Sequence, residues 1–215
     1  MSLQRQPQLV TLEGGEGAGK STVLAALRDA LLASGCEVVC TREPGGTPLA
    51  EQIRGLLLDT RHEPPSPETE LLLMFAARAQ HVSETILPAL RRGAWVLSDR
   101  FTDASYAYQG AARGGDVDFI AELERRVVGI SPGLTLLLDV PVEIGLQRAR
   151  GRGDADRIES EADEFFERVR TGYRTRAEAE PQRFRIIDAS QPVEAVAAQA
   201  VAQLQAHRDA LQVSG

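Results

Sequence analysis

The sequence has few cysteines and no long apolar run. Cys36 and Cys40 are its only cysteines, and no second pair completes a zinc site, so we expect buried structural thiols rather than metal or redox ligands. No apolar stretch approaches the roughly 20 residues of a membrane span, which excludes an integral membrane helix. Residues 1–7 lack the apolar core of a secretory signal, so we expect a cytoplasmic protein.

The sequence also lacks an excess of positive charge. Its formal net charge is −7 over 215 residues, whereas a broad nucleic-acid surface needs a basic excess to displace counterions. We therefore expect no nucleic-acid partner and only local binding of phosphate. The length fits one domain, spanning residues 1–215.

Short apolar runs alternate with longer helical patterns, which is typical of a parallel sheet covered on both faces. We predict an α/β fold with five strands, at Leu9–Leu12, Glu37–Thr41, Ala94–Ser98, Leu134–Leu138 and Phe184–Ile187. Helices are expected at Lys20–Ala33, Pro48–Asp59, Pro67–Arg92, Val117–Val128, Val142–Ala149, Glu161–Glu180 and from Pro192 to about Leu211. Pro88 is expected to kink or end the third of these helices.

A glycine-rich segment joins the first strand to the first helix. It has the spacing Gly-x-x-x-x-Gly-Lys-Ser, in which glycines let backbone N–H groups approach phosphate and the following helix N-terminus faces the anion. Lys20 is expected to reach the β- and γ-phosphates of a nucleoside triphosphate, and the Ser21 hydroxyl to bind Mg²⁺. The expected ATP-binding residues of this loop are Gly14, Gly15, Glu16, Gly17, Ala18, Gly19, Lys20, Ser21 and Thr22.

Charged residues follow two other strands where parallel sheets place ligand-binding groups, at the carboxyl ends. Asp99 and Arg100 follow one strand, where a carboxylate can hold Mg²⁺ and an arginine can bridge the phosphates of donor and acceptor. Arg42 follows another, and the Pro-Gly-Gly turn after it fixes Arg42 at the same edge. A surface ion pair and a simple strand-to-helix turn are the alternatives.

Arginines also cluster near residues 149–160, between glycines. Arg148, Arg150, Arg152 and Arg157 lie around Gly151 and Gly153. Cations with glycine hinges suit a small lid that covers the transferring phosphoryl group and excludes water. A solvated charged loop is the alternative.

These motifs together resemble one family, the thymidylate kinases, which have a P-loop nucleoside-monophosphate kinase fold and convert dTMP to dTDP with ATP. The resemblance covers nearly the whole chain. It rests on the phosphate loop and on the segments 41–47, 76–80, 99–101, 107–110 and 156–159. Arg42-Glu43-Pro44-Gly45-Gly46-Thr47 and Tyr108-Gln109-Gly110 are its most specific elements. It implies a magnesium-dependent enzyme of nucleotide biosynthesis and a homodimer.

The resemblance also implies residues that bind the acceptor. Glu16 resembles the carboxylate that accepts from the 3′-hydroxyl, Arg78 the arginine that donates to a thymine carbonyl, and Tyr108 the ring that crowds the 2′-position. Either Met74 or Phe75 is expected to stack on the base, and Ser105 to contact its polar edge. The expected substrate-binding residues are Glu16, Arg42, Pro44, Met74, Phe75, Arg78, Arg100, Ser105, Tyr108 and Gln109.

The family divides by the position of a catalytic cation, which lies either inside the phosphate loop or in the lid. Ala18 supplies no charge, whereas Arg150 and Arg152 do, so the chain resembles the bacterial type with lid arginines. By the same resemblance Arg148 packs over adenine and residues 188–192 border it. The expected catalytic residues are Lys20, Arg42, Arg100, Arg150 and Arg152, and the expected Mg²⁺ ligands are Ser21 and Asp99.

Two other functions fit parts of the sequence. A deoxynucleoside kinase needs a carboxylate base for its neutral acceptor, and Glu13 or Glu43 is available, but the acceptor-side arginines would then lack an anion. A nucleotide-dependent switch would need a guanine-reading Asn-Lys-x-Asp motif, which the sequence lacks. Phosphoryl transfer to dTMP therefore explains more of the motifs than either alternative.

Overall fold

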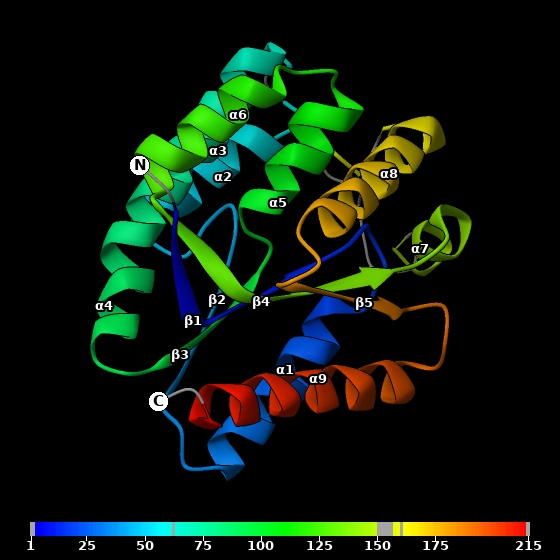
Figure 1. Ribbon diagram of the computed structural model, residues 1–215. Coiled ribbons are helices and arrows are strands. Elements are labelled where there is room, and N and C mark those ends of the chain that lie inside the picture. The colour runs from blue at the N-terminus through cyan, green and yellow to red at the C-terminus, as the bar shows by residue number, and fades with distance from the viewer. Residues whose placement is uncertain (1–2, 62, 150–156, 160, 214–215) are drawn as a thin grey trace.

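The computed structural model describes residues 3–61, 63–149, 157–159 and 161–213. Its centre is a parallel sheet of five strands in the order β2-β3-β1-β4-β5 (Figure 1). The predicted fold class is confirmed, and every predicted strand is present. The strands are β1 (Gln4–Glu13), β2 (Val38–Arg42), β3 (Trp95–Asp99), β4 (Ile130–Asp139) and β5 (Phe184–Asp188).

Helices cover both faces of the sheet (Figure 1). On one face α1 (Lys20–Ala33) packs against α9 (Val193–Val213). The other elements are α2 (Pro48–Leu58), α3 (Pro67–His81), η1 (Val82–Ile86), α4 (Leu87–Arg91), α5 (Thr102–Ser105), η2 (Tyr106–Ala112), α6 (Val117–Leu123), η3 (Glu124–Val128), α7 (Val142–Ala149) and α8 (Asp163–Ala179). Among them α4 and α8 contact the sheet on its opposite face.

Alternating side chains of the central strand enter different parts of the core, as the two-residue period of a strand requires. Val10 and Leu12 pack with α1 and α9, whereas Leu9 packs with α3 and η1. Both faces of the second half of β1 are buried, which explains why apolar residues occupy three of the four consecutive positions from Leu9 to Leu12 instead of alternating with exposed polar ones. The register then places the end of β2 beside the end of β3, with Arg42 opposite Asp99.

The structure differs from the predictions in several local features. The long helix predicted over Pro67–Arg92 is interrupted by the π-helical turn η1, which begins six residues before Pro88. A helical segment over Thr102–Ala112, comprising α5 and η2, was not predicted. Cys36 is half-buried and Cys40 is exposed, so the prediction of two buried thiols was wrong. Cys40 lies on β2, an edge strand of the sheet, where one side stays open.

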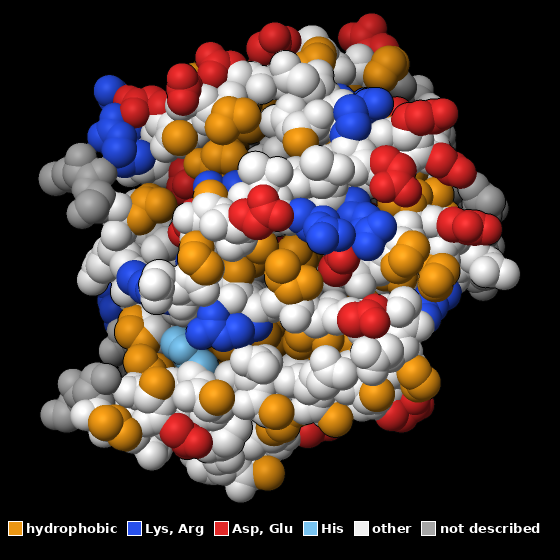
Figure 2. Space-filling model, turned by 45° about the vertical axis from the view of Figure 1, so that its right-hand side comes forward, with side chains coloured by type: hydrophobic (Ala, Val, Ile, Leu, Met, Phe, Trp, Pro, Cys, Tyr) orange, Lys and Arg blue, Asp and Glu red, His pale blue; other side chains and the backbone are white. Residues whose placement is uncertain are grey.

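None of the helices that the structure describes is long and apolar enough to span a membrane. On the face shown in Figure 2, Lys and Arg side chains form small groups separated by acidic and apolar side chains. This distribution agrees with the net charge of −7.

Candidate active site

The glycine-rich loop lies between β1 and α1, as predicted. Gly19 has a φ of 89° and precedes the first residue of α1, which is Lys20. A Cβ atom at Gly17, where φ is 68°, would lie only 1.9 Å from the carbonyl oxygen of Gly145 on α7. The loop is therefore packed against the start of α7, which accommodates glycine alone.

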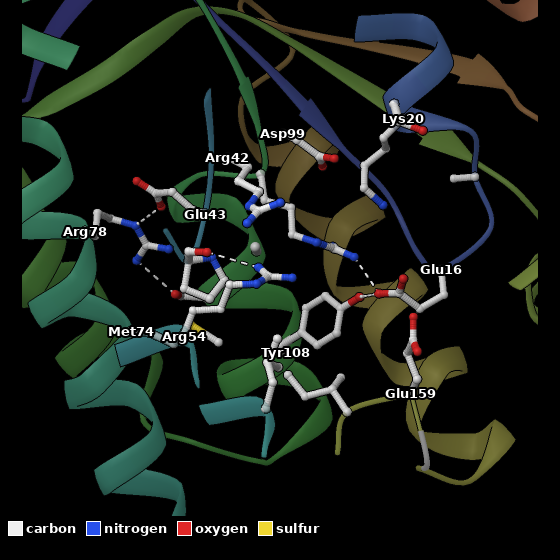
Figure 3. Close-up of a pocket in the computed structure, with 18 of the residues that line it drawn as sticks. Glu16, Lys20, Arg42, Glu43, Arg54, Met74, Arg78, Asp99, Tyr108 and Glu159 are labelled. Carbon is white, nitrogen blue, oxygen red and sulfur yellow. Dashed lines mark hydrogen bonds and ion pairs between the residues drawn. The ribbon is translucent and has the colours of Figure 1, made fainter. Parts of the chain in front are cut away.

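One cavity joins this loop to the ends of β2 and β3 and to helices α2, α3 and η2 (Figure 3). It includes most of the residues that the sequence predicts for the site, in spite of their separation along the chain. The lining residues are Glu16, Gly17, Ala18, Gly19, Lys20, Ser21, Arg42, Glu43, Pro44, Arg54, Leu58, Met74, Arg78, Asp99, Arg100, Ala104, Ser105, Tyr108, Gln109, Ile158 and Glu159.

Lys20 lies at the phosphate-loop end of the cavity. Its Nζ atom donates to the carbonyl oxygens of Gly14 at 3.1 Å and Gly15 at 3.0 Å. Burial lowers the pKa of Lys20, and the neighbouring Arg100 lowers it further. A buried ammonium group that contacts only neutral carbonyls is strongly stabilised when an anion binds beside it. This end of the cavity therefore favours phosphate.

Glu16 and Arg100 form an ion pair at the same end (Figure 3). Arg100 Nη2 donates to Glu16 Oε1 at 2.6 Å, and Arg100 Nη1 donates to the Gly14 carbonyl and to the Tyr173 hydroxyl, both at 3.0 Å. Arg100 has a φ of 69°, which is uncommon for a residue with a side chain. The Tyr108 hydroxyl donates to the same Glu16 oxygen at 3.1 Å. Four side chains thus lie together here in defined orientations.

Asp99 and Ser21 both line this cavity. Asp99 Oδ1 is buried and has no hydrogen-bond partner among the residues that the structure describes. A buried carboxylate oxygen without a partner is costly unless a donor or cation reaches it. Together with the Ser21 hydroxyl it offers the hard oxygen ligands that Mg²⁺ prefers, so these residues fit a magnesium ion.

Two arginines lie along the middle of the cavity (Figure 3). Arg42 is largely exposed and pairs with Glu51 at 3.1 Å. Arg54 of α2 donates from Nη1 to the carbonyl of Pro44 at 3.0 Å. Arg54 was not predicted from the sequence, because the face that a helix turns toward a cavity depends on packing. The one signal in the sequence was that the helix carrying Arg54 directly follows the Pro-Gly-Gly turn after Arg42.

Met74 and Phe75 have different positions at the far end of the cavity. Met74 lines it, whereas Phe75 is only 2% exposed and packs in the core beside Val82 and Ile86. The Phe75 ring lies against Arg78, with its centroid 4.7 Å from Cζ. Of the two residues predicted to stack on a base, Met74 is therefore the one that reaches the cavity.

Arg78 is held at this end by three hydrogen bonds, two of which are drawn in Figure 3. Its Nε donates to Glu43 Oε2 at 2.6 Å, Nη1 to the Ser105 hydroxyl at 3.0 Å and Nη2 to the Phe101 carbonyl at 3.0 Å. Its side chain is 2% exposed. A fixed, donor-only group is therefore presented beside Met74.

Gln109 is tied to a buried carboxylate. Its Nε2 donates to Glu70 Oε1 at 2.8 Å, and Arg157 donates to the other Glu70 oxygen at 2.6 Å. Burial raises the pKa of Glu70, but Gln109 and the arginines outweigh this effect and lower it overall. Since an ionised carboxylate only accepts, the Gln109 amide is oriented with its nitrogen toward Glu70.

The predicted lid falls mostly outside the described residues, as do Arg150 and Arg152. Arg157, which was grouped with the lid arginines, donates from Nε to the carbonyl of Leu57 at 2.7 Å. Arg148 donates to the carbonyls of Ala189 at 2.7 Å and Ser190 at 3.1 Å. Arg148 thus contacts the loop that was predicted to border adenine.

Neither carboxylate suggested as a base is placed to act as one. Glu13 is fully buried, accepts from Phe101 N at 2.7 Å and is not among the residues that line the cavity. Both oxygens of Glu43 are engaged, one with Arg78 and one with His81. The site therefore suits an acceptor that is already anionic.

The chain is similar in sequence to known proteins. A family model described as thymidylate kinase matches residues 12–200. A thymidylate kinase of Alkalilimnicola ehrlichii is 59% identical over 191 residues, covering 88% of each chain. Thymidylate kinases of Pseudomonas putida and Ectopseudomonas mendocina are 58% and 55% identical over 188 and 203 residues. They cover 87% and 94% of this chain, and 91% and 93% of their own.

Proposed function

The chain belongs to the thymidylate kinase family, and we propose that it transfers the ATP γ-phosphoryl group to dTMP between the two ends of the cavity described above. It thus phosphorylates dTMP to dTDP, with ATP as the co-substrate. One observation carries the proposed site. In a protein of net charge −7, a single cavity is lined by the phosphate loop and by four arginines, Arg42, Arg54, Arg78 and Arg100.

The donor binds at the phosphate loop. Backbone N–H groups of residues 14–19 and the N-terminus of α1 face the phosphates, and Lys20 leaves its carbonyl partners for the β- and γ-phosphates. Mg²⁺ would be held by Ser21 and Asp99, and when bound it neutralises charge on the phosphates. The loop around Ala189, which Arg148 fixes, would border adenine.

The acceptor binds at the other end. Met74 covers the base, Arg78 and Ser105 meet its carbonyl edge, and Gln109 lies beside them with Pro44. Glu16 accepts from the 3′-hydroxyl, and the Tyr108 ring occupies the space that a 2′-hydroxyl would need. Arg42 and Arg100 neutralise the 5′-phosphate and stabilise charge in the transition state, with Arg150 and Arg152 completing this role from the lid.

The transfer needs no general base, because the attacking phosphate oxygen is already ionised. Catalysis consists of aligning the two phosphates and stabilising charge on the equatorial oxygens. Cations meet this requirement, and the cavity supplies four arginines and Lys20.

A panel of acceptors tests the proposal. ADP release would be measured with dTMP, dUMP, dCMP, UMP, AMP and thymidine. We expect dTMP to be the best acceptor and thymidine to give no turnover above the background ATPase rate. Turnover with thymidine but not with dTMP would establish a deoxynucleoside kinase instead.

We also propose that the protein is a cytoplasmic homodimer. Helices α2, α3 and α6 lie near one another (Figure 1). Each exposes an apolar side chain, with Leu56 of α2 at 55%, Leu72 of α3 at 49% and Phe119 of α6 at 40%. Apolar faces of this kind are typical of subunit contacts. Light scattering should give twice the chain mass of 23.3 kDa, and Leu72→Arg should lower it toward one chain mass. A wild-type monomer would contradict the proposal.

A further inference from the structure

A buried chain of hydrogen bonds lies behind Arg78. Glu43 follows β2, is 4% exposed and accepts from Arg78 Nε through Oε2. Its other oxygen, Oε1, lies 2.9 Å from His81 Nδ1, and His81 Nε2 lies 2.6 Å from the Thr41 hydroxyl. His81 is completely buried. These hydrogen bonds thus connect Thr41 on β2 with His81, the last residue of α3. From His81 they continue through Glu43 to the Arg78 guanidinium.

The polarity of this chain follows from its chemistry. Burial raises the pKa of Glu43, but Arg78 and His81 outweigh this effect and lower it overall, so the carboxylate is ionised. An ionised carboxylate only accepts, which requires the hydrogen of His81 to be on Nδ1. In the neutral ring Nε2 then accepts from the Thr41 hydroxyl. Each partner has one role, and the Glu43 carboxylate is fixed from both sides.

The surrounding backbone accommodates this arrangement. A Cβ atom at Gly46, where φ is 87°, would lie 2.4 Å from His81 Cδ2 and 2.7 Å from the Thr41 hydroxyl oxygen. The glycine therefore leaves the room that the imidazole occupies. Thr41 at the end of β2 and Glu43 just after it both contact His81, whereas Arg42 between them pairs with Glu51 of α2. One strand end thus supplies a phosphate-binding arginine and the support for Arg78.

Arg78 has five N–H groups, of which the described residues accept from three. Ser105 accepts from Arg78, so its own O–H is directed elsewhere. This end of the cavity therefore presents donors. A ligand with a carbonyl oxygen here gains a hydrogen bond, whereas an exocyclic amino group would meet a second donor.

We propose that Glu43, His81 and Thr41 are positioning residues that fix the orientation of the Arg78 guanidinium, and thereby set the preference for a base with a carbonyl over one with an amino group. The inference rests on the proposed contact between Arg78 and the base. None of the three residues needs to touch the substrate. Their effect on specificity is exerted through Arg78.

The test compares kcat/KM for dTMP with kcat/KM for dCMP, which carries an amino group in place of one of the two thymine carbonyls and lacks the methyl group. Because the methyl difference is the same for every variant, a change in the ratio between variants reports on the carbonyl. In Glu43→Gln the new amide nitrogen faces an N–H donor of either Arg78 or His81. Because an amide nitrogen cannot accept, one of these two hydrogen bonds is lost. We expect the dTMP/dCMP ratio to fall about tenfold, mostly through KM for dTMP, with KM for ATP unchanged. Glu37→Gln, at an exposed glutamate paired with Arg92, is the matched control and should keep the ratio.

Substitutions at the other two residues keep the test valid if Glu43→Gln folds poorly. His81→Asn retains a donor in the place of Nδ1, whereas His81→Ala removes it. We expect the ratio to fall in His81→Ala and to be largely restored in His81→Asn. Thr41→Val, which preserves shape and removes the hydroxyl, should lower the ratio less than His81→Ala.

Arg78→Met separates this inference from the proposed function. An unchanged ratio in Arg78→Met would refute the base contact itself. A collapsed ratio in Arg78→Met, with wild-type ratios in the Glu43 and His81 variants, would refute only the positioning chain. Equal losses with dTMP and dCMP, accompanied by a lower Tm, would likewise overturn it, since that pattern indicates a purely structural role.

Discussion

Arg100 Nη2 donates to Glu16 Oε1 at 2.6 Å, joining the arginine after β3 to the acid within the phosphate loop. The two side chains are 16% and 20% exposed, so the pair is partly shielded from solvent. Glu16 would repel phosphate in a site that only bound ATP. Beside Arg100 its charge is compensated, and we propose that this carboxylate accepts from a sugar hydroxyl when the acceptor is bound.

The role of Glu16 can be tested with an acceptor that lacks the 3′-hydroxyl. We expect Glu16→Gln to raise KM for dTMP about tenfold, since a charge-assisted hydrogen bond becomes a neutral one. The 3′-deoxy analogue of dTMP should bind the variant and the wild-type protein about equally. Steady-state kinetics with both acceptors provides the measurement. An equal penalty for the two acceptors would show that Glu16 acts only through Arg100.

Asp99 provides a test of the magnesium site. Replacement by Asn keeps the shape of a side chain whose Oδ1 has no hydrogen-bond partner among the described residues, and removes the carboxylate. We expect Asp99→Asn to raise the Mg²⁺ concentration for half-maximal activity about tenfold, with KM for dTMP unchanged. Activity would be titrated against Mg²⁺ at fixed ATP. A wild-type titration would remove Asp99 from the site.

Lys20 is the only lysine in the sequence, so amine-directed labelling reports on the phosphate loop. Because burial lowers the pKa of Lys20, its amine should react at a lower pH than that of an ordinary lysine. Labelling should abolish activity, and ATP should protect Lys20 but not the N-terminal amine, which is the internal control. Mass spectrometry of the labelled peptides gives both rates. Equal labelling of Lys20 with and without ATP would contradict its assignment.

Glu13 makes stability depend on pH. Burial, and to a lesser degree Asp103, raise the pKa of Glu13 from 4.5 to about 8. Between these values the folded protein holds one proton more than the unfolded chain, so this group lowers stability as pH rises, by at most ~1.4 kcal/mol per unit. Glu13→Gln retains the acceptor for Phe101 N and should flatten the profile. The free energy of unfolding would be measured with urea from pH 5 to 8 for both proteins. Identical slopes of this free energy against pH in the wild type and in Glu13→Gln would contradict the prediction.

The sequence predicted the strands and the groups at their carboxyl ends, because buried parallel strands are distinct apolar runs. Arg42 and Asp99 were both expected at one edge of the sheet, and they are paired in register. Strand order is not encoded in such runs. The exposure of Cys40 was therefore missed, since it depends on β2 lying at the edge.

Helix orientation was harder to predict than helix position. Met74 and Phe75 are adjacent in the sequence, and the packing of α3 decided that Met74 faces the cavity. Arg54 was missed for the same reason. The unpredicted helical segment α5–η2 carries Tyr106 and Tyr108, aromatic residues that favour strands. Tertiary contacts with α8 override that preference.

The central claim is that cations in this cavity stabilise phosphoryl transfer between ATP and dTMP, and Arg100 tests it most directly. We predict that Arg100→Ala lowers kcat by about 100-fold or more while a cooperative unfolding transition is retained. Arg91→Ala, at an exposed arginine ending α4, is the control and should match the wild type. A near wild-type kcat for Arg100→Ala would contradict the account.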